Sequence, residues 1–364
     1  MVERFLARRT VSDMSNNPSC PVFIVGPSRC GNTLLQEVLN LHSRLHICSE
    51  THWFDDDRSL RCQAIETDED RKQSQDWFLS LSDRPFGYNG DPDQGWLDRS
   101  DLEREARAIT TDAPRDCYFV AWCQLDAVQH GKARWGEKTP RHVFRISDIL
   151  QAFPDAKILC CIRNAPAMIA SYRQWGLRTG HDLAKESSST ATEVEKQRTR
   201  ASYHPAIAAM LWRGAVRSSL RAREQFGEDR VKLVFYEQLV LQPEGTVSDL
   251  VDWLGETFEP QTLSVPMVNS SFDQHQADAG FVSHPLDRWQ QQLDASDLAV
   301  IQLLCSNELR RLDYAAVSEW HQLWRALPAM LRLPMAVLRA ARANQDRTGH
   351  LLPYIWRRVK PDWL

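Results

Sequence analysis

The chain has 364 residues, of which 43% are hydrophobic and 25% are charged, and its formal net charge is -4. This composition excludes a disordered, collagen-like or disulfide-scaffold protein, and the length suffices for a large core in one α/β domain or in two domains. The net charge gives no general electrostatic reason to bind nucleic acid, so an anionic ligand must be held by a local pocket.

The cysteines and the apolar segments predict a cytoplasmic protein that does not span a membrane. Nine cysteines are scattered along the chain without a Cys-X-X-Cys pair, and the N-terminus has no signal-peptide pattern. Both features are typical of a reduced, cytoplasmic setting. The longest apolar runs, such as residues 158–162, are far too short to cross a bilayer.

In the first part of the chain, a strand and a helix are separated only by a loop that contains glycines. Residues 1–19 are polar and basic without a period, so we expect a loose N-terminal arm. Residues 21–25 are apolar and β-branched and end at Gly26, which predicts a buried strand. Leucines and a valine at helical spacing over 34–41 predict a helix directly afterwards. Residues 55–130 begin with acidic, tryptophan-containing sequence without a strand pattern, which predicts a helical or loop insertion.

Strand-like and helix-like segments alternate through the rest of the chain. Strands are predicted over 156–162 and 231–236, and helices from Pro166 through Tyr172, over 207–226 and over 247–254. Residues 176–204 are polar and charged, and we expect a mobile loop there. This alternation predicts an α/β fold, a parallel sheet flanked by crossover helices, within a domain that covers residues 20–320.

The C-terminal segment, residues 321–364, is predicted to be a basic amphipathic tail. Its arginines and one lysine outnumber its acidic residues and alternate with Leu, Met, Ile and Trp. One interpretation is a packed terminal helix whose arginines extend to solvent. The other is a tail that makes peripheral contact with a membrane surface or a partner.

A loop with the spacing of a P-loop follows the first predicted strand. It has Gly26, four residues, Gly31, one residue and then Thr33, in the order strand, loop, helix. Backbone N–H groups and a helix N-terminus converge on a phosphate-like anion in such loops. A nucleotide-hydrolysing P-loop has lysine where this chain has Asn32, which argues against a kinase or an ATPase. The alternative is a tight turn without a ligand.

With this loop and four further segments, the sequence resembles the PAPS-dependent sulfotransferases, in particular the branch of the tyrosylprotein and many bacterial enzymes. The loop itself resembles the family's 5′-phosphosulfate loop. The further segments are Gly136-Glu-Lys-Thr-Pro140, Arg163 with Ser171 eight residues later, Val234-Phe-Tyr-Glu-Gln-Leu239, and Arg288-Trp289 followed by Leu293 and Asp297-Leu298. They span nearly the whole chain. The resemblance implies a P-loop-like parallel sheet with helical insertions and a helical C-terminal tail.

The resemblance also implies the residues that bind the donor, PAPS. The loop residues Arg29, Cys30, Gly31, Asn32 and Thr33 are expected to hold the 5′-phosphosulfate, with Asn32 donating through its amide and Cys30 offering at most a weak thiol contact. Arg163 and Ser171 are expected to hold the 3′-phosphate. Arg288 and Trp289 complete the predicted donor site. No metal is expected, because the transferred sulfuryl group carries less charge than a phosphoryl group.

Three further assignments concern catalysis. By resemblance, Lys138 and Arg29 neutralise the charge that builds on the leaving group, and Glu50 is the base that takes the acceptor proton. We expect burial in the cleft to raise the basicity of Glu50, and the helix after the loop to end beside it. His52 is the alternative base and His142 a weaker third choice.

The sequence therefore predicts a sulfotransferase that uses PAPS and a hydroxyl acceptor, with carbohydrate, lipid and phenol all open and a small molecule favoured. A nucleotide-dependent kinase or other transferase with a modified P-loop is the first alternative. A non-enzymatic protein that binds an anion or nucleotide is the second. The sequence does not predict the oligomeric state.

Overall fold

A computed structural model describes residues 20–54, 67–81, 95–109, 115–177, 197–265, 281 and 286–344. The predicted N-terminal arm lies outside the described residues. So do residues 178–196 of the predicted mobile loop and residues 345–364 of the predicted tail.

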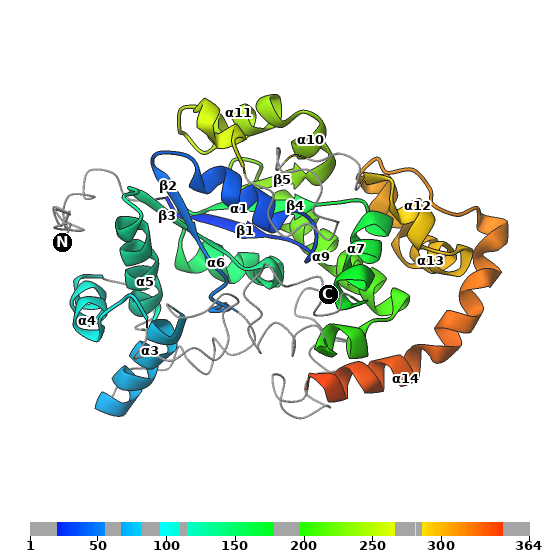
Figure 1. Cartoon of the computed structure of the whole chain (residues 1–364), viewed down its shortest axis with the longest axis horizontal. Coiled ribbons are helices and arrows are strands. Elements are labelled where there is room, and N and C mark those ends of the chain that lie inside the picture. Colours follow the sequence, from blue (N-terminus) through cyan, green and yellow to red (C-terminus); the bar gives the residue numbers. More distant parts are fainter. Residues whose placement is uncertain are drawn as a thin grey trace, which may run out of the picture.

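The described strands form one five-stranded parallel sheet in the order β2-β3-β1-β4-β5. The strands are β1 (Val22–Val25), β2 (Leu45–Cys48), β3 (Arg134–Lys138), β4 (Lys157–Ile162) and β5 (Val231–Phe235). Figure 1 shows them at the centre of the molecule with helices around them. The predicted α/β class with a parallel sheet is confirmed.

Helices cover both faces of the sheet and bury alternate strand residues. Val22 and Ile24 of β1 belong to one core cluster, whereas Phe23 and Val25 belong to the other. The first cluster includes residues of α1 (Asn32–Asn40), α7 (Ala165–Leu177), α9 (Pro205–Phe226), α11 (Pro243–Trp253) and α13 (Ala295–Arg311). The second includes residues of α3 (Asp68–Leu81), α4 (Arg99–Ala108), α5 (Asp116–Gln129) and α6 (Ile146–Ala152). Parallel sheets are stable when both faces are covered in this way.

The sequence analysis missed β2 and β3. β2 has only four residues and follows the first helix after a short turn, so its pattern merges with that of the helix. β3 is mostly polar and contains Gly136, which weakens a strand signal. In the sheet that glycine is required, because a Cβ there would lie 2.5 Å from the Val22 carbonyl oxygen and 2.4 Å from Ile47 Cδ1.

The predicted insertion, residues 55–130, is mostly helical where the structure describes it, with bends, turns or coil at 67, 95–98, 109, 115 and 130. It contributes α3, α4 and α5, and its residues 55–66, 82–94 and 110–114 lie outside the described part. Residues 178–196 of the predicted mobile loop, 176–204, lie outside the described part, and the described residues on either side of them are helical in part. α7 continues to Leu177, residues 197–202 are helical, and the His204 side chain caps α9 by accepting a hydrogen bond from the Ala206 N–H.

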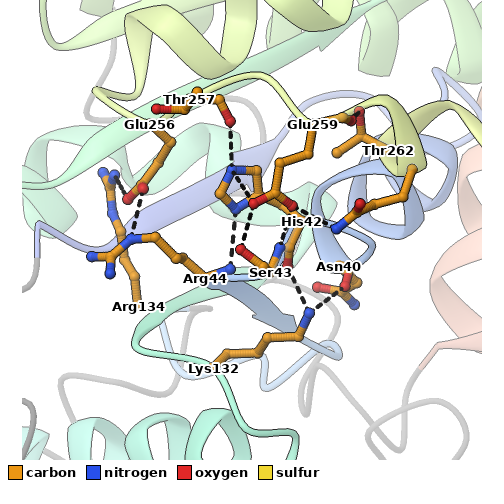
Figure 2. Close-up of polar contacts among 11 residues, drawn as sticks. Asn40, His42, Ser43, Arg44, Lys132, Arg134, Glu256, Thr257, Glu259 and Thr262 are labelled. Atoms are coloured by element: carbon orange, nitrogen blue, oxygen red, sulfur yellow. Dashed lines mark hydrogen bonds and ion pairs between the residues drawn. The ribbon is translucent and has the colours of Figure 1, made fainter.

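A polar network closes the amino edge of the sheet, opposite the strand ends where a ligand is expected (Figure 2). Arg134, at the start of β3, donates to the carbonyls of Cys20 and Leu254 at 2.7 Å each and pairs with Glu256 at 3.2 Å. Arg44 also pairs with Glu256, at 2.9 Å. The network therefore ties the starts of β2 and β3 to the segment that follows α11.

The remaining described elements are 3-10 turns and short or terminal helices. They are η2 (Pro140–Arg145), α10 (Tyr236–Leu241), η4 (Pro260–Leu263), α12 (Trp289–Gln292), η6 (Trp320–Ala326) and α14 (Leu327–Ala343). α14 lies along the outer edge of the molecule in Figure 1 and packs on α13 and α9. Among the described residues, no helix is both long and apolar enough to cross a membrane.

We expect Arg134→Met to lower the free energy of unfolding by about 3 kcal/mol, because it leaves the Cys20 and Leu254 carbonyls without their donor and removes the buried one of the two arginines that pair with Glu256. The matched control is Arg44→Met, which removes the other partner of Glu256. The Arg44 side chain is 53% exposed, so its loss should cost less than about 1 kcal/mol. Urea unfolding midpoints at an unchanged m-value measure both effects. Equal costs would contradict the importance assigned to Arg134.

Candidate active site

The carboxyl ends of β1, β2, β3 and β4 meet at one edge of the sheet, and most of the predicted site residues follow these ends. The loop with Arg29 follows β1, Glu50 and His52 follow β2, Lys138 ends β3, and Arg163 follows β4. β1 has β3 on one side and β4 on the other, which makes it the point where the strand order reverses. Ligands of α/β sheets bind at such a point.

The loop between β1 and α1 presents a helix N-terminus to this edge. Gly31 has a φ of 92°, and a Cβ there would lie 2.6 Å from the Tyr236 ring, so the position requires glycine. α1 begins directly afterwards, at Asn32. The N–H groups of a first helical turn have no intrahelical partners and favour an anion.

Two side chains of the loop face inward, contrary to expectation. The Asn32 amide donates to the Pro27 carbonyl at 2.9 Å, and Asn32 is only 4% exposed. Cys30 lies in the core, where burial raises the pKa of its thiol and keeps it neutral. In this structure Asn32 bonds within the loop, and Cys30 packs in the core. Thr33 is half-buried.

The structure brings together Arg29, Arg163 and Ser171, three residues far apart in the sequence. Arg29 Nε donates to Ser171 Oγ on α7 at 3.3 Å, and Arg163 Nη1 donates to the Arg29 carbonyl at 3.2 Å. Arg163 and Ser171 are each 5% exposed. Arg29 has a φ of 69°, the left-handed region that non-glycine residues rarely adopt. Two guanidinium groups and a hydroxyl therefore lie beside the N-terminus of α1.

The surroundings of Arg163 fix its direction. Its guanidinium lies over the Tyr236 ring, 4.3 Å from the ring centroid, and its carbonyl accepts from Trp212 Nε1 at 2.8 Å. The next residue, Asn164, donates its N–H to Glu237 Oε1 at 2.8 Å. The Val234–Leu239 segment, whose sequence resembles the family's, thus contacts Arg163 through the Tyr236 ring and contacts the next residue, Asn164, through Glu237.

Lys138, Glu50 and His52 form a second cluster at the same edge. Lys138 Nζ lies 2.7 Å from Glu50 Oε1, and His52 Nε2 lies 3.4 Å from Glu50 Oε2. Burial by itself raises the pKa of Glu50, but Lys138 and His52 outweigh it and lower that pKa to about 2. The expected gain in basicity from burial is therefore absent in this arrangement. Glu50 is also delivered by β2, and not by the end of the preceding helix as expected.

A buried carboxylate, Glu137, holds the segment after β2 against the end of β3, and the sequence analysis did not identify it. Its Oε1 accepts from the Thr51 N–H at 3.0 Å and from the Thr51 hydroxyl at 2.9 Å, and it also accepts from the Thr139 hydroxyl. Its Oε2 lies 3.1 Å from His142 Nδ1. Burial raises its pKa, but His142, Thr139 and the Thr51 N–H outweigh burial and lower it. From the sequence, Glu137 could be noticed only as a member of the Gly136–Pro140 segment that resembles the family.

These contacts decide the position of both histidines. His142 is fully buried, and its Nε2 accepts from the Phe54 N–H at 3.1 Å, so the third candidate base is a structural residue. His52 donates its N–H to Thr139 Oγ1 at 3.3 Å and has a φ of 54°. The His52 ring lies beside Glu50. That position is compatible with the expectation that His52 is the alternative base.

The last predicted donor residues, Arg288 and Trp289, lie next to α7. Both are half-buried, and Trp289 begins α12. α12 joins α7 through a hydrogen bond between Gln292 Nε2 and Gln174 Oε1 at 2.7 Å. Arg288 and Trp289 therefore lie beside the helix that carries Ser171.

A sulfotransferase family model matches residues 21–260. The chain belongs to the sulfotransferase family. A protein-tyrosine sulfotransferase of Drosophila melanogaster is 23% identical over 257 residues, which are 70% of this chain but only 42% of that relative. The chain thus spans less than half the length of that relative.

Solved sulfotransferase structures are also similar to it. The sulfotransferase domain of the Synechococcus PCC 7002 olefin synthase has a TM-score of 0.48 at 20% identity, over 82% of this chain and 96% of that one. A sulfotransferase from Mycobacterium avium has a TM-score of 0.42 at 18% identity, over 85% and 81%.

Two tryptophans lie beside the candidate site. Trp53 and Trp77 line a cavity of about 310 Å³ between α3 and the segment after Glu50. Trp122 is buried, and Trp96 is half exposed. A larger cavity, of about 470 Å³, lies under α14 and away from the strand ends.

Among the described residues, His46, Cys48 and Asp126 are close enough together to share a metal ion. His46 Nε2 already bonds to Asp126 Oδ2 at 2.8 Å, and burial raises the pKa of the Cys48 thiol. The three therefore form a hydrogen-bonded cluster whose geometry is explained without an ion. That the reaction needs no metal stays a prediction.

We expect Glu137→Gln to lower the free energy of unfolding by about 3 kcal/mol at pH 7, because the amide places a donor against the Thr51 and Thr139 donors. The folded-state pKa of Glu137 is below its ordinary value of 4.5. Its stabilising charge is therefore fully present above about pH 4.5 and is lost as the pH falls below that value. The difference between wild type and variant should shrink in the same range.

The measurement is the unfolding free energy of both proteins between pH 7 and pH 3. Glu244→Gln, an exposed carboxylate at the start of α11, is the control and should stay within about 0.5 kcal/mol of wild type throughout. A Glu137→Gln cost that does not change with pH would contradict the role of the buried charge.

Proposed function

We propose that this sulfotransferase moves a sulfuryl group from PAPS to the hydroxyl of an acceptor and releases adenosine 3′,5′-bisphosphate. The observation that carries the proposal is the cluster of Arg29, Arg163 and Ser171 beside the N-terminus of α1. We infer that a small molecule, carbohydrate, lipid or phenol is the acceptor, and that the protein works in the cytoplasm.

The donor site follows from charge and burial. PAPS has phosphate groups at two ends of one adenosine, so its site needs two separate groups of donors. The N–H groups at the start of α1, with Arg29, suit the 5′-phosphosulfate. Arg163 and Ser171, both nearly buried, suit the 3′-phosphate, and the Tyr236 ring under Arg163 limits that guanidinium to one orientation.

The same arrangement argues against the alternative of phosphoryl transfer from ATP. In kinases of the P-loop type, a lysine at the position of Asn32 reaches the β- and γ-phosphates. The Asn32 amide is already used inside the loop, on the Pro27 carbonyl. We therefore assign the cations of this site to sulfuryl transfer.

In the proposed reaction, the acceptor oxygen forms a bond to sulfur while the bond from sulfur to the bridging phosphate oxygen breaks. Glu50 takes the proton of the acceptor hydroxyl, and Lys138 and Arg29 stabilise the negative charge on the leaving phosphate. Lys138 also controls the base. While it pairs with Glu50, the carboxylate has a low pKa and is a weak base. As Lys138 turns to the leaving group, the pKa of Glu50 rises, so both steps advance together.

The donor assignment predicts that Arg163→Ala weakens binding of adenosine 3′,5′-bisphosphate by about 10- to 100-fold, because a charge-assisted contact is lost. Binding of adenosine 5′-monophosphate should change little. Arg173→Ala is the matched control, because this arginine lies on α7 but bonds to the Gln292 carbonyl and Asp297. Calorimetric titration of the three proteins with both nucleotides is the measurement. A preference for the 3′-phosphate that survives in Arg163→Ala would refute the assignment.

The base assignment predicts that Glu50→Gln lowers turnover by about 10²- to 10⁴-fold with donor affinity nearly unchanged, and that His52→Ala costs much less. The pH dependence separates the two candidates. Because the pKa of Glu50 is lowered, kcat/KM of the wild type should stay level as the pH falls to 5. A base of ordinary imidazole pKa would make kcat/KM fall below about pH 6.5. That fall, together with an inactive His52→Ala variant, would transfer the role to His52.

A further inference from the structure

Large apolar side chains are exposed along η6 and α14. Figure 1 shows α14 at the periphery of the molecule, away from the strand ends that carry the candidate active site. The exposed fractions are high even for surface residues. We call the following residues the outer face: Trp320 (83% exposed), Trp324 (70%), Leu327 (60%), Leu331 (73%), Met335 (71%) and Leu338 (40%).

The outer face lies on one side of the helix, and the side that packs against the protein is a different one. At 3.6 residues per turn, positions 327, 331, 335 and 338 recur on a single stripe. The packing side is made by Ala336, Ala340 and Ala341, which are buried, and by Ala329, Met330 and Leu333, which contact the cluster on α9 and α13. A helix that is apolar on two sides is normally covered on both. The packing side therefore holds α14 in place, and the outer face needs another surface.

The charge of this segment indicates what that surface is. Residues 320–344 contain four arginines and no Asp or Glu, although the whole chain has a net charge of -4. Arg332, Arg339 and Arg342 are exposed on α14, and Arg339 also donates to the Ala201 carbonyl at 2.9 Å. Arg325 lies over the Trp324 ring, 5.8 Å from its centroid. Glu319, directly before Trp320, is the nearest acidic residue in the sequence, and it lies 3.1 Å from His321 Nδ1. Asp294 and Asp297 lie across the cavity that Arg332, Met335 and Arg339 line. Along α14 itself the charged residues are all arginines, and an apolar stripe beside cations is complementary to an apolar layer bordered by anions.

We propose that the outer face of η6 and α14 docks on an anionic lipid bilayer. Leu327, Leu331 and Met335 enter the boundary between headgroups and acyl chains, with α14 parallel to the bilayer plane. Trp320 and Trp324 occupy the headgroup level, where their amphipathic rings are stable. The arginines reach lipid phosphates and carboxylates, which attract basic residues within about a Debye length of the surface.

A second copy of the chain fits this face less well. In a two-fold symmetric contact, the same patch meets itself. The arginines of residues 320–344 would then face those of the other copy with no acidic residue from either segment between them. The bilayer avoids this repulsion, and it accepts a single helix without requiring a complementary groove.

The experiment is co-sedimentation of the full chain with vesicles of 70% phosphatidylcholine and 30% phosphatidylserine, and with vesicles of phosphatidylcholine alone. We expect partitioning on the anionic vesicles to exceed that on the neutral ones by about tenfold or more, and to fall steeply between 0.1 and 0.5 M NaCl. Leu327→Glu should reduce partitioning on anionic vesicles by about tenfold or more, because it places a carboxylate in the contact.

Leu241→Glu is the matched control, because Leu241 is also 60% exposed but lies on α10. It should keep partitioning within about twofold of wild type. Binding of adenosine 3′,5′-bisphosphate is measured on each variant to confirm that the fold is intact. No binding to either vesicle, or equal binding to both, overturns the proposal. Light scattering without lipid that finds a dimer which Leu327→Glu dissociates also overturns it and assigns the outer face to a second copy.

Discussion

The candidate site depends on one buried carboxylate and the donors that surround it. Glu137 takes hydrogen bonds from the backbone and hydroxyl of Thr51, from Thr139 and from His142, with no exposure to solvent. Since Glu137 and Lys138 are neighbours on β3, their side chains point to opposite faces of the sheet. On one face, Glu137 binds Thr51 in the segment after β2. On the other face, Lys138 pairs with Glu50 of the same segment. A carboxylate buried this deeply is stable only when all of its donors are in place. Because Thr51 is one of these donors, its hydrogen bonds to Glu137 hold the adjacent Glu50 close to Lys138.

In the proposed donor site, the anion loop does not carry the usual lysine. Its cations come from outside the helix: Arg29 from the loop, Lys138 from the end of β3 and Arg163 from the end of β4. Arg29 and Arg163 lie beside the N-terminus of α1, and Lys138 lies at the same edge of the sheet, beside Glu50. Asn32 is free to close the loop through Pro27 for this reason. A site of this kind recognises where an anion's charges lie as well as how many there are.

The sequence was sufficient for the elements with a clear period and insufficient for those defined by their neighbours. β1, β4 and β5 were predicted because buried parallel strands are continuous apolar runs, and α1, α7, α9 and α11 were predicted as helices, whereas α10, directly after β5, was not. β2 and β3 were not predicted. β2 has only four residues and follows a helix closely, and β3 is a polar strand around Gly136, so neither shows a clear hydrophobic period in the sequence. Arg29, Arg163 and Ser171 came from resemblance, and the fold brings them together. The low pKa of Glu50 and the role of Glu137 could not be predicted, because both depend on contacts between residues more than 80 positions apart.

Arg29 and His52 have φ angles of 69° and 54°, conformations that are unfavourable for residues with a Cβ. Both occur within a residue or two of the groups assigned to sulfur and proton transfer, and both are fixed by contacts with other parts of the fold. Folding therefore meets a conformational cost that binding would otherwise incur, and the donor meets a loop that is already shaped. Selection for thermal stability alone would replace these residues with glycine, and the protein would become more robust as it became a poorer catalyst.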